Sequence, residues 1–209
     1  MDKIKLGVLV GGTSIEREVS KKSCENLLAN LDENKYDITV YHLPADSNTE
    51  WAKNIISNPP QIVLSALHGG NGENGSIQGF LHCLNIPYIG SKVLSSAICM
   101  NKAMAKTVMK ANHIQVPDHV FVMRGVDFSQ YEESIKLMGF PLIVKPNRGG
   151  SSIGVIVARN MEDIHYGIKN IMETYDDDVL IEKFIDGKEI NCCVLQGENG
   201  PEAMAVLDV

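Results

Sequence analysis

Several motifs that would assign a function at once are missing from this 209-residue sequence. It contains no G-x-x-x-x-G-K-[S/T] P-loop, and Gly11-Gly12 lacks the later glycine of the dinucleotide fingerprint G-x-G-x-x-G. No apolar run approaches the roughly 20 residues that a membrane-spanning helix needs. A P-loop nucleotidase and a membrane protein are therefore not indicated, and a Rossmann-type oxidoreductase ranks low.

Cysteine and positive charge are both scarce. The five cysteines (Cys24, Cys83, Cys99, Cys192, Cys193) form no Cys-x-x-Cys pair, so we expect small buried thiols and no zinc site. Scattered thiols and a strand-like N-terminus with no room for a signal peptide predict a cytoplasmic protein. The 26 acidic side chains outnumber the 19 Lys and Arg, and the net charge of −7 disfavours nucleic acid as a partner.

The composition of 44% hydrophobic and 22% charged residues is that of a folded protein with a proper core. In the first ninety residues, strand-like runs alternate with helical patterns. Strands are predicted at Lys5–Val10, Asp37–Leu43 and Ile62–Leu67, with a strand fragment at Ile86–Ile89. This alternation predicts an α/β domain with a parallel sheet covered on both faces.

A second α/β layer is predicted after residue 95. A helix is expected over Ser95–Asn112, with Ile98, Met104, Val108 and Met109 buried. Further elements follow: strands at His119–Met123, Leu142–Lys145, Ile153–Ala158 and Val179–Lys183, and helices at Tyr131–Met138 and Met161–Thr174. The sequence stops inside a strand-like run, Ala203–Val209, whereas domains normally end in exposed polar segments. We therefore expect this chain to be the first part of a longer protein.

The stretch Pro141–Val155 reads P-L-I-V-K-P-N-R-G-G-S-S-I-G-V and is the strongest chemical signal in the chain. Two β-branched runs flank a loop of glycines and serines, whose backbone N–H groups could close on an anion. Lys145 adds a fixed positive charge at the end of the first run. The pattern indicates a lid over nucleotide phosphates, although a mobile surface hairpin would explain the glycines alone.

Two other glycine-containing loops each follow a predicted strand, where ligands bind in open α/β sheets. Gly11–Ser14 opens a helix, and Glu16 just after it could bind a substrate ammonium group, whereas Glu18 suits an ordinary first helical turn. His68–Gly75 holds four glycines. His68, at a strand end, is a candidate ligand contact, and Glu73 is expected to hold its loop together through backbone N–H groups.

Four segments together resemble the D-alanine–D-alanine ligases of the ATP-grasp superfamily. They read G-G-T-S-I-E-R-E-V-S, A-L-H-G-G-N-G-E-N-G-S-I-Q-G, V-K-P-N-R-G-G-S-S-I-G-V and L-I-E-K-F-I-D-G-K-E, in order and at natural spacing. The resemblance implies three parts: a Rossmann-like N-terminal α/β substrate-binding domain at residues 1–95, a central ATP-grasp subdomain at 96–185, and the start of a C-terminal subdomain at 186–209.

The resemblance also implies an activity, the ATP-dependent joining of two D-alanines through an acyl phosphate, for peptidoglycan synthesis. By motif matching, Glu16 and Ser151 are catalytic and, with His68, bind the first D-alanine. The implied ATP contacts are Lys102, Lys145, Gly150, Ser151, Ser152, Glu182, Lys183, Phe184 and Glu189, with Glu189 on the ribose. Without the resemblance, the residues favour interpretations that involve no ligand for two of these. Glu182 would be a solvated strand end and Lys102 an exposed helix lysine.

Other implied features lie beyond this sequence. The resemblance implies Mg²⁺ as a second cofactor, with its ligands expected beyond residue 209, and we expect no metal site and little catalysis in the 209 residues themselves. A homodimer through the N-terminal domain is carried over in the same way. A D-alanine–D-serine or D-alanine–D-lactate ligase, or a non-catalytic nucleotide-binding module, remain alternatives.

Overall fold

A parallel sheet organises the first part of the chain. In the computed structural model, which describes residues 2–46 and 48–208, β1 (Ile4–Gly11) lies between β2 (Tyr36–Leu43) and β3 (Ile62–Ser65). Both pairings are parallel, as the sequence predicted. The strand fragment expected at 86–89 is reduced to a single parallel bridge between Tyr88 and Val63, so that prediction was too generous.

Alternate residues of β1 feed two separate cores, one on each face of this sheet. Leu9 packs in a cluster with Tyr41 and Ile55, whereas Val8 packs in another that contains Cys24. Four helices belong to this part: α1 (Arg17–Asn30), α2 (Glu50–Ser57), α3 (Gly70–Glu73) and α4 (Ser76–Cys83). Because α1 supplies Cys24 and α2 supplies Ile55, the sheet is covered on both faces, and this part of the predicted fold is confirmed.

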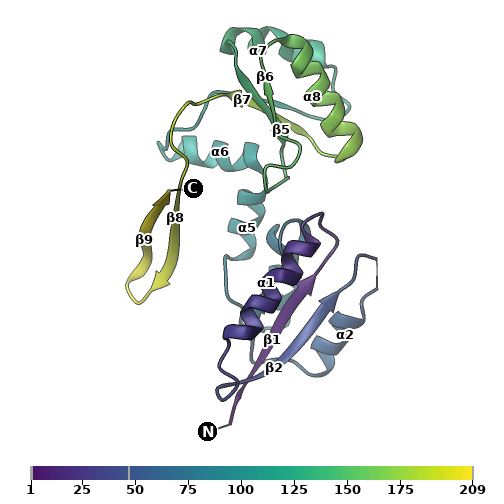
Figure 1. Ribbon diagram of the computed structural model, residues 1–209, viewed down its shortest axis with the longest axis vertical. Helices are drawn as coiled ribbons and strands as arrows, with labels where there is room; N and C mark the ends of the chain where they lie inside the picture. The colour runs from purple at the N-terminus through teal and green to yellow at the C-terminus, as the bar shows by residue number, and fades with distance from the viewer. Residues whose placement is uncertain (1, 47, 209) are drawn as a thin grey trace.

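Two helices, α5 (Val93–Met100) and α6 (Lys102–Ala111), lie between the first sheet and the second (Figure 1). The single helix predicted over Ser95–Asn112 breaks at Asn101, whose side chain caps α6 by accepting a hydrogen bond from Met104 N at 3.0 Å. The burial predicted for Met104, Val108 and Met109 is wrong, because their exposed fractions are 50%, 40% and 39%. The side chains of α6 that contact the rest of the protein include Lys102 and Lys106.

The second sheet is antiparallel and has the strand order β4-β7-β5-β6. Its strands are β4 (His119–Val122), β5 (Leu142–Pro146), β6 (Ile156–Ala158) and β7 (Val179–Lys183). The short 3-10 helix η1 (Phe128–Tyr131), α7 (Glu132–Met138) and α8 (Met161–Thr174) pack against it and complete one core. The strand predicted to begin at Ile153 begins later, because residues 151–154 form a turn.

The last two strands, β8 (Ile190–Gly197) and β9 (Gly200–Asp208), form an antiparallel hairpin that lies apart from both sheets in Figure 1. The prediction of buried cysteines is wrong for four of the five: Cys24 is buried, whereas Cys83, Cys99, Cys192 and Cys193 are exposed. Two of the exposed thiols lie on this hairpin, whose residues belong to none of the core clusters in the described part of the chain. Nowhere in the described residues is there a helix long and apolar enough to cross a membrane.

Candidate functional site

A cavity of about 1070 Å³ lies between the first sheet and the second. Its walls come from loops far apart in the sequence: those that follow β1 and β3, the helix α5, and the glycine-rich loop between β5 and β6. Glu16, His68, Lys102, Gly150 and Ser151 all line it. Five of the residues predicted for the site therefore meet around one space.

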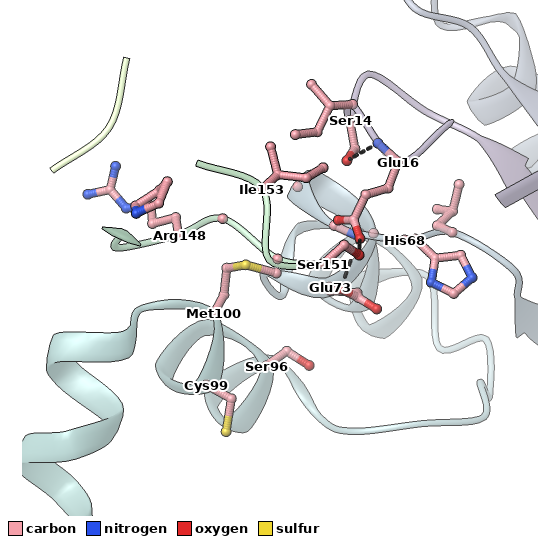
Figure 2. A pocket seen from close by; sticks show the side chains of 18 of the residues that line it. Ser14, Glu16, His68, Glu73, Ser96, Cys99, Met100, Arg148, Ser151 and Ile153 are labelled. Atoms are coloured by element: carbon pink, nitrogen blue, oxygen red, sulfur yellow. Dashed lines mark hydrogen bonds between the residues drawn. The ribbon is translucent and has the colours of Figure 1, made fainter. Parts of the chain in front are cut away.

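Glu16 and Ser151 connect the two halves of the protein across this cavity (Figure 2). The Ser151 hydroxyl donates a hydrogen bond to Glu16 Oε1. Glu16 is held from its own side as well, because its backbone N–H donates to Ser14 Oγ at 3.1 Å. The loop comes close to Glu16 at Gly150 as well, where a Cβ would be in ordinary van der Waals contact with Glu16 Oε2 at 3.4 Å. A carboxylate and a hydroxyl thus face one another where the two halves meet.

The loop after β3 places His68 beside this contact. Glu73 Oε2 accepts a hydrogen bond from Gly69 N at 2.9 Å, which confirms the loop-holding role expected for Glu73. His68 Nε2 lies 2.8 Å from the hydroxyl of Ser23 in α1, so the imidazole is fixed by the neighbouring helix. The Glu16 carboxylate and the His68 imidazole therefore line the same cavity, beyond the carboxyl ends of β1 and β3.

Lys102 reaches the glycine-rich loop from the start of α6. Its ammonium donates to the carbonyl oxygen of Gly149 and, at 3.5 Å, to that of Asn147. Burial, and next the positive charge of Lys145, lower the pKa of Lys102 below its usual range. The interpretation of Lys102 as an exposed helix lysine is wrong, because the side chain lies in the cavity wall against backbone carbonyls.

Lys145 and Glu182 lie on the neighbouring strands β5 and β7, and form an ion pair. As a whole residue Glu182 is only 6% exposed, so it is no solvated strand end. Lys106 of α6 also reaches this carboxylate, with Nζ 2.8 Å from Oε2. Burial alone would raise the pKa of Glu182, but the hydrogen bonds and charges of the two lysines outweigh it and hold the pKa below its usual range.

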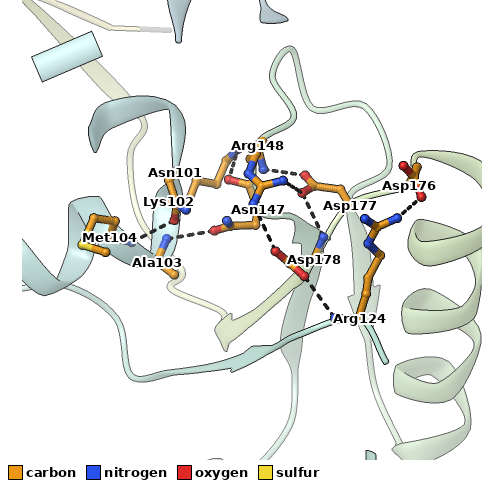
Figure 3. A network of polar contacts seen from close by, with 10 residues as sticks. All are labelled: Asn101, Lys102, Ala103, Met104, Arg124, Asn147, Arg148, Asp176, Asp177 and Asp178. Carbon is orange, nitrogen blue, oxygen red and sulfur yellow. Dashed lines mark hydrogen bonds and ion pairs between the residues drawn. The ribbon is translucent and has the colours of Figure 1, made fainter. Parts of the chain in front are cut away.

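The sequence reasoning missed Lys106, and it also missed the network at the base of the glycine-rich loop (Figure 3). Asn147 is fully buried, accepts from Ala103 N at 3.0 Å through Oδ1, and donates its backbone N–H to Asp178 O at 2.9 Å. Arg148 N donates to Asp177 Oδ2 at 2.6 Å. One sequence signal could have indicated this network. The basic segment K-P-N-R ends one strand and the acidic run Asp176–Asp178 precedes another, and the structure pairs these two strand ends.

The cavity lining does not include Lys145, Glu182 or the four remaining predicted residues. Ser152 is exposed in the turn after Ser151, and both serines have positive φ, 57° and 50°. Lys183 is exposed at the end of β7, and Phe184 and Glu189 are exposed on the segment that leads from β7 to the hairpin. Their proposed contacts with a nucleotide stay predictions. The described residues bring together no group of three His, Cys, Asp or Glu side chains suited to a metal ion.

Comparison with known proteins identifies the family. The family described as D-ala D-ala ligase C-terminus matches residues 108–209, and the one described as D-ala D-ala ligase N-terminus matches residues 45–91. A crystal structure of a D-alanine–D-alanine ligase from Bacillus anthracis is 33% identical, with a TM-score of 0.80, and the match covers 99% of this chain and 71% of that chain. This chain belongs to the D-alanine–D-alanine ligase family.

Sequence and structural similarity to relatives extends along most of this chain. The D-alanine–D-alanine ligase of Bacillus anthracis is 40% identical over 199 residues, which are 95% of this chain and 63% of the relative. A structure of that organism's ligase complexed with ATP has a TM-score of 0.84 and 35% identity, and the match covers 98% of this chain and 65% of that one. The chain thus spans about 63% of the length of the curated relatives it matches.

Proposed function

We propose that this ligase-family protein joins two D-alanines to D-alanyl-D-alanine at the expense of ATP, as a cytoplasmic step of peptidoglycan synthesis. The observation that carries the proposal is the contact of Glu16 with Ser151 across a cavity whose wall also contains Lys102. A carboxylate suits an amino acid's ammonium group, a hydroxyl suits its carboxylate, and a lysine suits phosphate. All three groups line the same cavity, which supports the proposal that an amino acid and ATP meet there.

The proposed chemistry has two steps. A carboxylate oxygen of the first D-alanine attacks the γ-phosphorus of ATP, and ADP leaves. The amine of the second D-alanine then attacks the acyl carbon, loses a proton, and inorganic phosphate leaves. Glu16 binds the first ammonium group with His68 beside it, and Ser151 orients the carboxylate. Mg²⁺, when bound, would neutralise charge on the phosphates.

The same arrangement supports a set of proposed nucleotide contacts. Phosphoryl transfer depends mainly on positioning and on donors that face the developing negative charge. Lys102, Lys145 and the N–H groups of Gly150–Ser152 supply these on the phosphate side. The segment Glu182–Phe184 would border the adenine, and Glu189 would bind the ribose hydroxyls.

The direct test is release of phosphate that depends on both ATP and D-alanine, measured on the protein at its full encoded length. Dipeptide formation at a matching rate would support the proposal, and much faster turnover of another acid–amine pair would contradict it. Calorimetry with ATP tests the alternative of a non-catalytic module, which would bind nucleotide without turnover.

Two substitutions separate the two substrates. Glu16→Gln removes the charge opposite the ammonium group, so the KM for the first D-alanine should rise more than the KM for ATP. Lys145→Ala removes a phosphate partner, so ATP use should suffer instead. An unchanged KM for ATP and unchanged turnover in Lys145→Ala would exclude Lys145 from the phosphate site.

A second candidate function, the joining of D-alanine to D-serine, rests on one comparison. The structure of the VanG D-Ala:D-Ser ligase from Enterococcus faecalis has a TM-score of 0.82 and 27% identity to this chain. Offering D-serine and D-lactate in competition with D-alanine distinguishes the two candidates by the product formed.

We also propose that the protein forms a homodimer through its N-terminal domain. Sedimentation equilibrium would test this oligomeric state.

A further inference from the structure

Glu182 is a buried carboxylate that contacts two cations where one would neutralise it. Lys145 of β5 contacts Oε1 and Lys106 of α6 lies 2.8 Å from Oε2. All three side chains are largely withdrawn from solvent, with exposed fractions of 9% for Glu182, 14% for Lys106 and 21% for Lys145. The two lysines occupy different oxygens, so either can leave without disturbing the other.

The helix brings a third cation to the same place. Lys102 and Lys106 are four residues apart in α6 and therefore share one face. Lys102 contacts backbone carbonyls of the glycine-rich loop, and Lys106 contacts the strand β7. Two ammonium groups thus contact one carboxylate, and a third contacts the neighbouring loop. The second cation on Glu182 can bind an anion while Glu182 keeps a partner.

We propose that Lys106 is a positioning residue for the nucleotide, which holds Glu182 so that Lys145 can leave this carboxylate and bind a phosphate. The inference rests on the proposed function, because it takes the phosphates of ATP as the anion. Lys106 is the cation that stays, and Lys145 is the one that exchanges partners.

The physical argument concerns a buried charge that loses its partner. Removing one member of a buried ion pair leaves an uncompensated charge, which is strongly unfavourable. Without Lys106, a move of Lys145 to a phosphate would leave Glu182 in that state. Lys145 would then stay on Glu182, and the phosphate site would lose its cation. With Lys106 in place, Glu182 remains paired throughout.

The test compares Lys106→Met with the unchanged protein at its full encoded length, using calorimetric titration with ATP and with inorganic tripolyphosphate. Tripolyphosphate reports on the phosphate side alone, because it has no base or ribose. We expect Lys106→Met to weaken the binding of both by about tenfold or more. Lys106→Arg, which keeps the charge, should bind within about threefold of the unchanged protein.

A double variant distinguishes this role from a merely structural one. In Lys106→Met combined with Glu182→Gln, no carboxylate retains Lys145, so tripolyphosphate affinity should recover to near that of the unchanged protein. Lys110→Met is the matched control, because Lys110 lies on the same helix one turn further and is exposed. It removes an equal charge and should leave both affinities unchanged.

Each outcome has a separate meaning. Unchanged binding by Lys106→Met, or a double variant as weak as the single one, would overturn the inference while leaving the ligase assignment intact. If the unchanged protein binds ATP but forms no D-alanyl dipeptide, the proposed function fails, and the Lys106 comparison still decides this inference. Absence of binding to both anions in the unchanged protein would overturn both.

Discussion

Gly69 is a position where the backbone requires glycine. Its φ of 64° and ψ of 178° lie in a region that is essentially restricted to glycine. The space is closed as well, because a Cβ would collide with the carboxylate of Glu16 and would lie 2.6 Å from Ser14 Oγ. One glycine therefore sets both the path of the loop after β3 and the room for the Glu16 side chain.

Gly69→Ala should lower the free energy of unfolding by about 1–3 kcal/mol, the usual range for such backbone strain. It should also displace the Glu16 carboxylate from Ser151. Urea denaturation measures the first effect. Gly79→Ala is the control, since Gly79 lies within α4 with open space around its Cβ position. That change should be neutral or stabilising by up to about 1 kcal/mol, and equal losses in both variants would contradict the argument.

Glu182 should make the stability of the protein depend on acid pH. Its pKa is lowered in the folded state, because Lys106 and Lys145 outweigh the effect of burial. His119 lies across from it on β4 and is another titratable group that faces the carboxylate, as is Lys102. A lowered pKa means that the stabilisation is complete above the ordinary value of 4.5 and is lost as the pH falls below it.

The prediction compares the unchanged protein with Glu182→Gln. The difference in their free energies of unfolding should be largest near neutral pH and should shrink below pH 4.5, because a protonated glutamate resembles glutamine. Chemical denaturation at a series of pH values measures it. A difference that stays constant down to the acid transition would show that the ion pairs do not stabilise the fold.

At the scale of elements, α8 provides much of the core of the second sheet. Ile164 and Ile171 are fully buried on its inner face, as the helical spacing predicted, and Gly167 lies between them. A Cβ on Gly167 would lie 2.9 Å from Val144 Cγ1, which shows how closely the helix and β5 approach. The face of this helix is therefore matched in shape to the sheet.

Ile171→Ala should lower the free energy of unfolding by about 2–5 kcal/mol, because it removes buried methyl groups and leaves a cavity. Leu137→Ala is the matched control on α7, where the leucine is 81% exposed. The control should change stability by no more than about 0.5 kcal/mol. Urea denaturation of both variants gives the comparison, and a loss below about 1 kcal/mol for Ile171→Ala would contradict the assigned core.

At the scale of the whole molecule, the hairpin of β8 and β9 is the part least supported by the rest. Its residues are exposed or half-exposed on both strands, including Ile190, Val206 and Leu207. A two-stranded hairpin on its own is marginally stable in water. In this 209-residue chain its backbone hydrogen bonds should therefore open far more often than those of the two sheets.

Hydrogen exchange provides the measurement. The amides of residues 190–208 should exchange through local opening, whereas those of β1 and β5 should exchange near the rate set by global unfolding. In a chain of about 23 kDa the two groups separate clearly by mass spectrometry of peptides. Equal protection of the hairpin and of β5 would show that the hairpin is packed in solution.

Much of the fold was open to prediction from local pattern. The strands β1, β2 and β7 and the helix α8 follow directly from alternation and helical spacing, because those periods decide which side chains share a face. The break at Asn101 was missed, since the same polar residue fits inside a helix or at its cap. The exposure of Met104 and Val108 was missed because hydrophobicity does not report which face of a helix meets the protein.

The sequence by itself determined the elements, the family and the glycine-rich loops, because each is recorded in neighbouring residues. Only the tertiary structure decided the contacts that carry the proposed chemistry. Glu16 and Ser151 are 135 positions apart, and Lys145 and Glu182 are 37 apart. Whether a charged side chain is solvated or paired depends on groups that the fold brings beside it. For that reason the sequence did not predict that Glu182 is buried and paired, or that Lys106 is one of its partners.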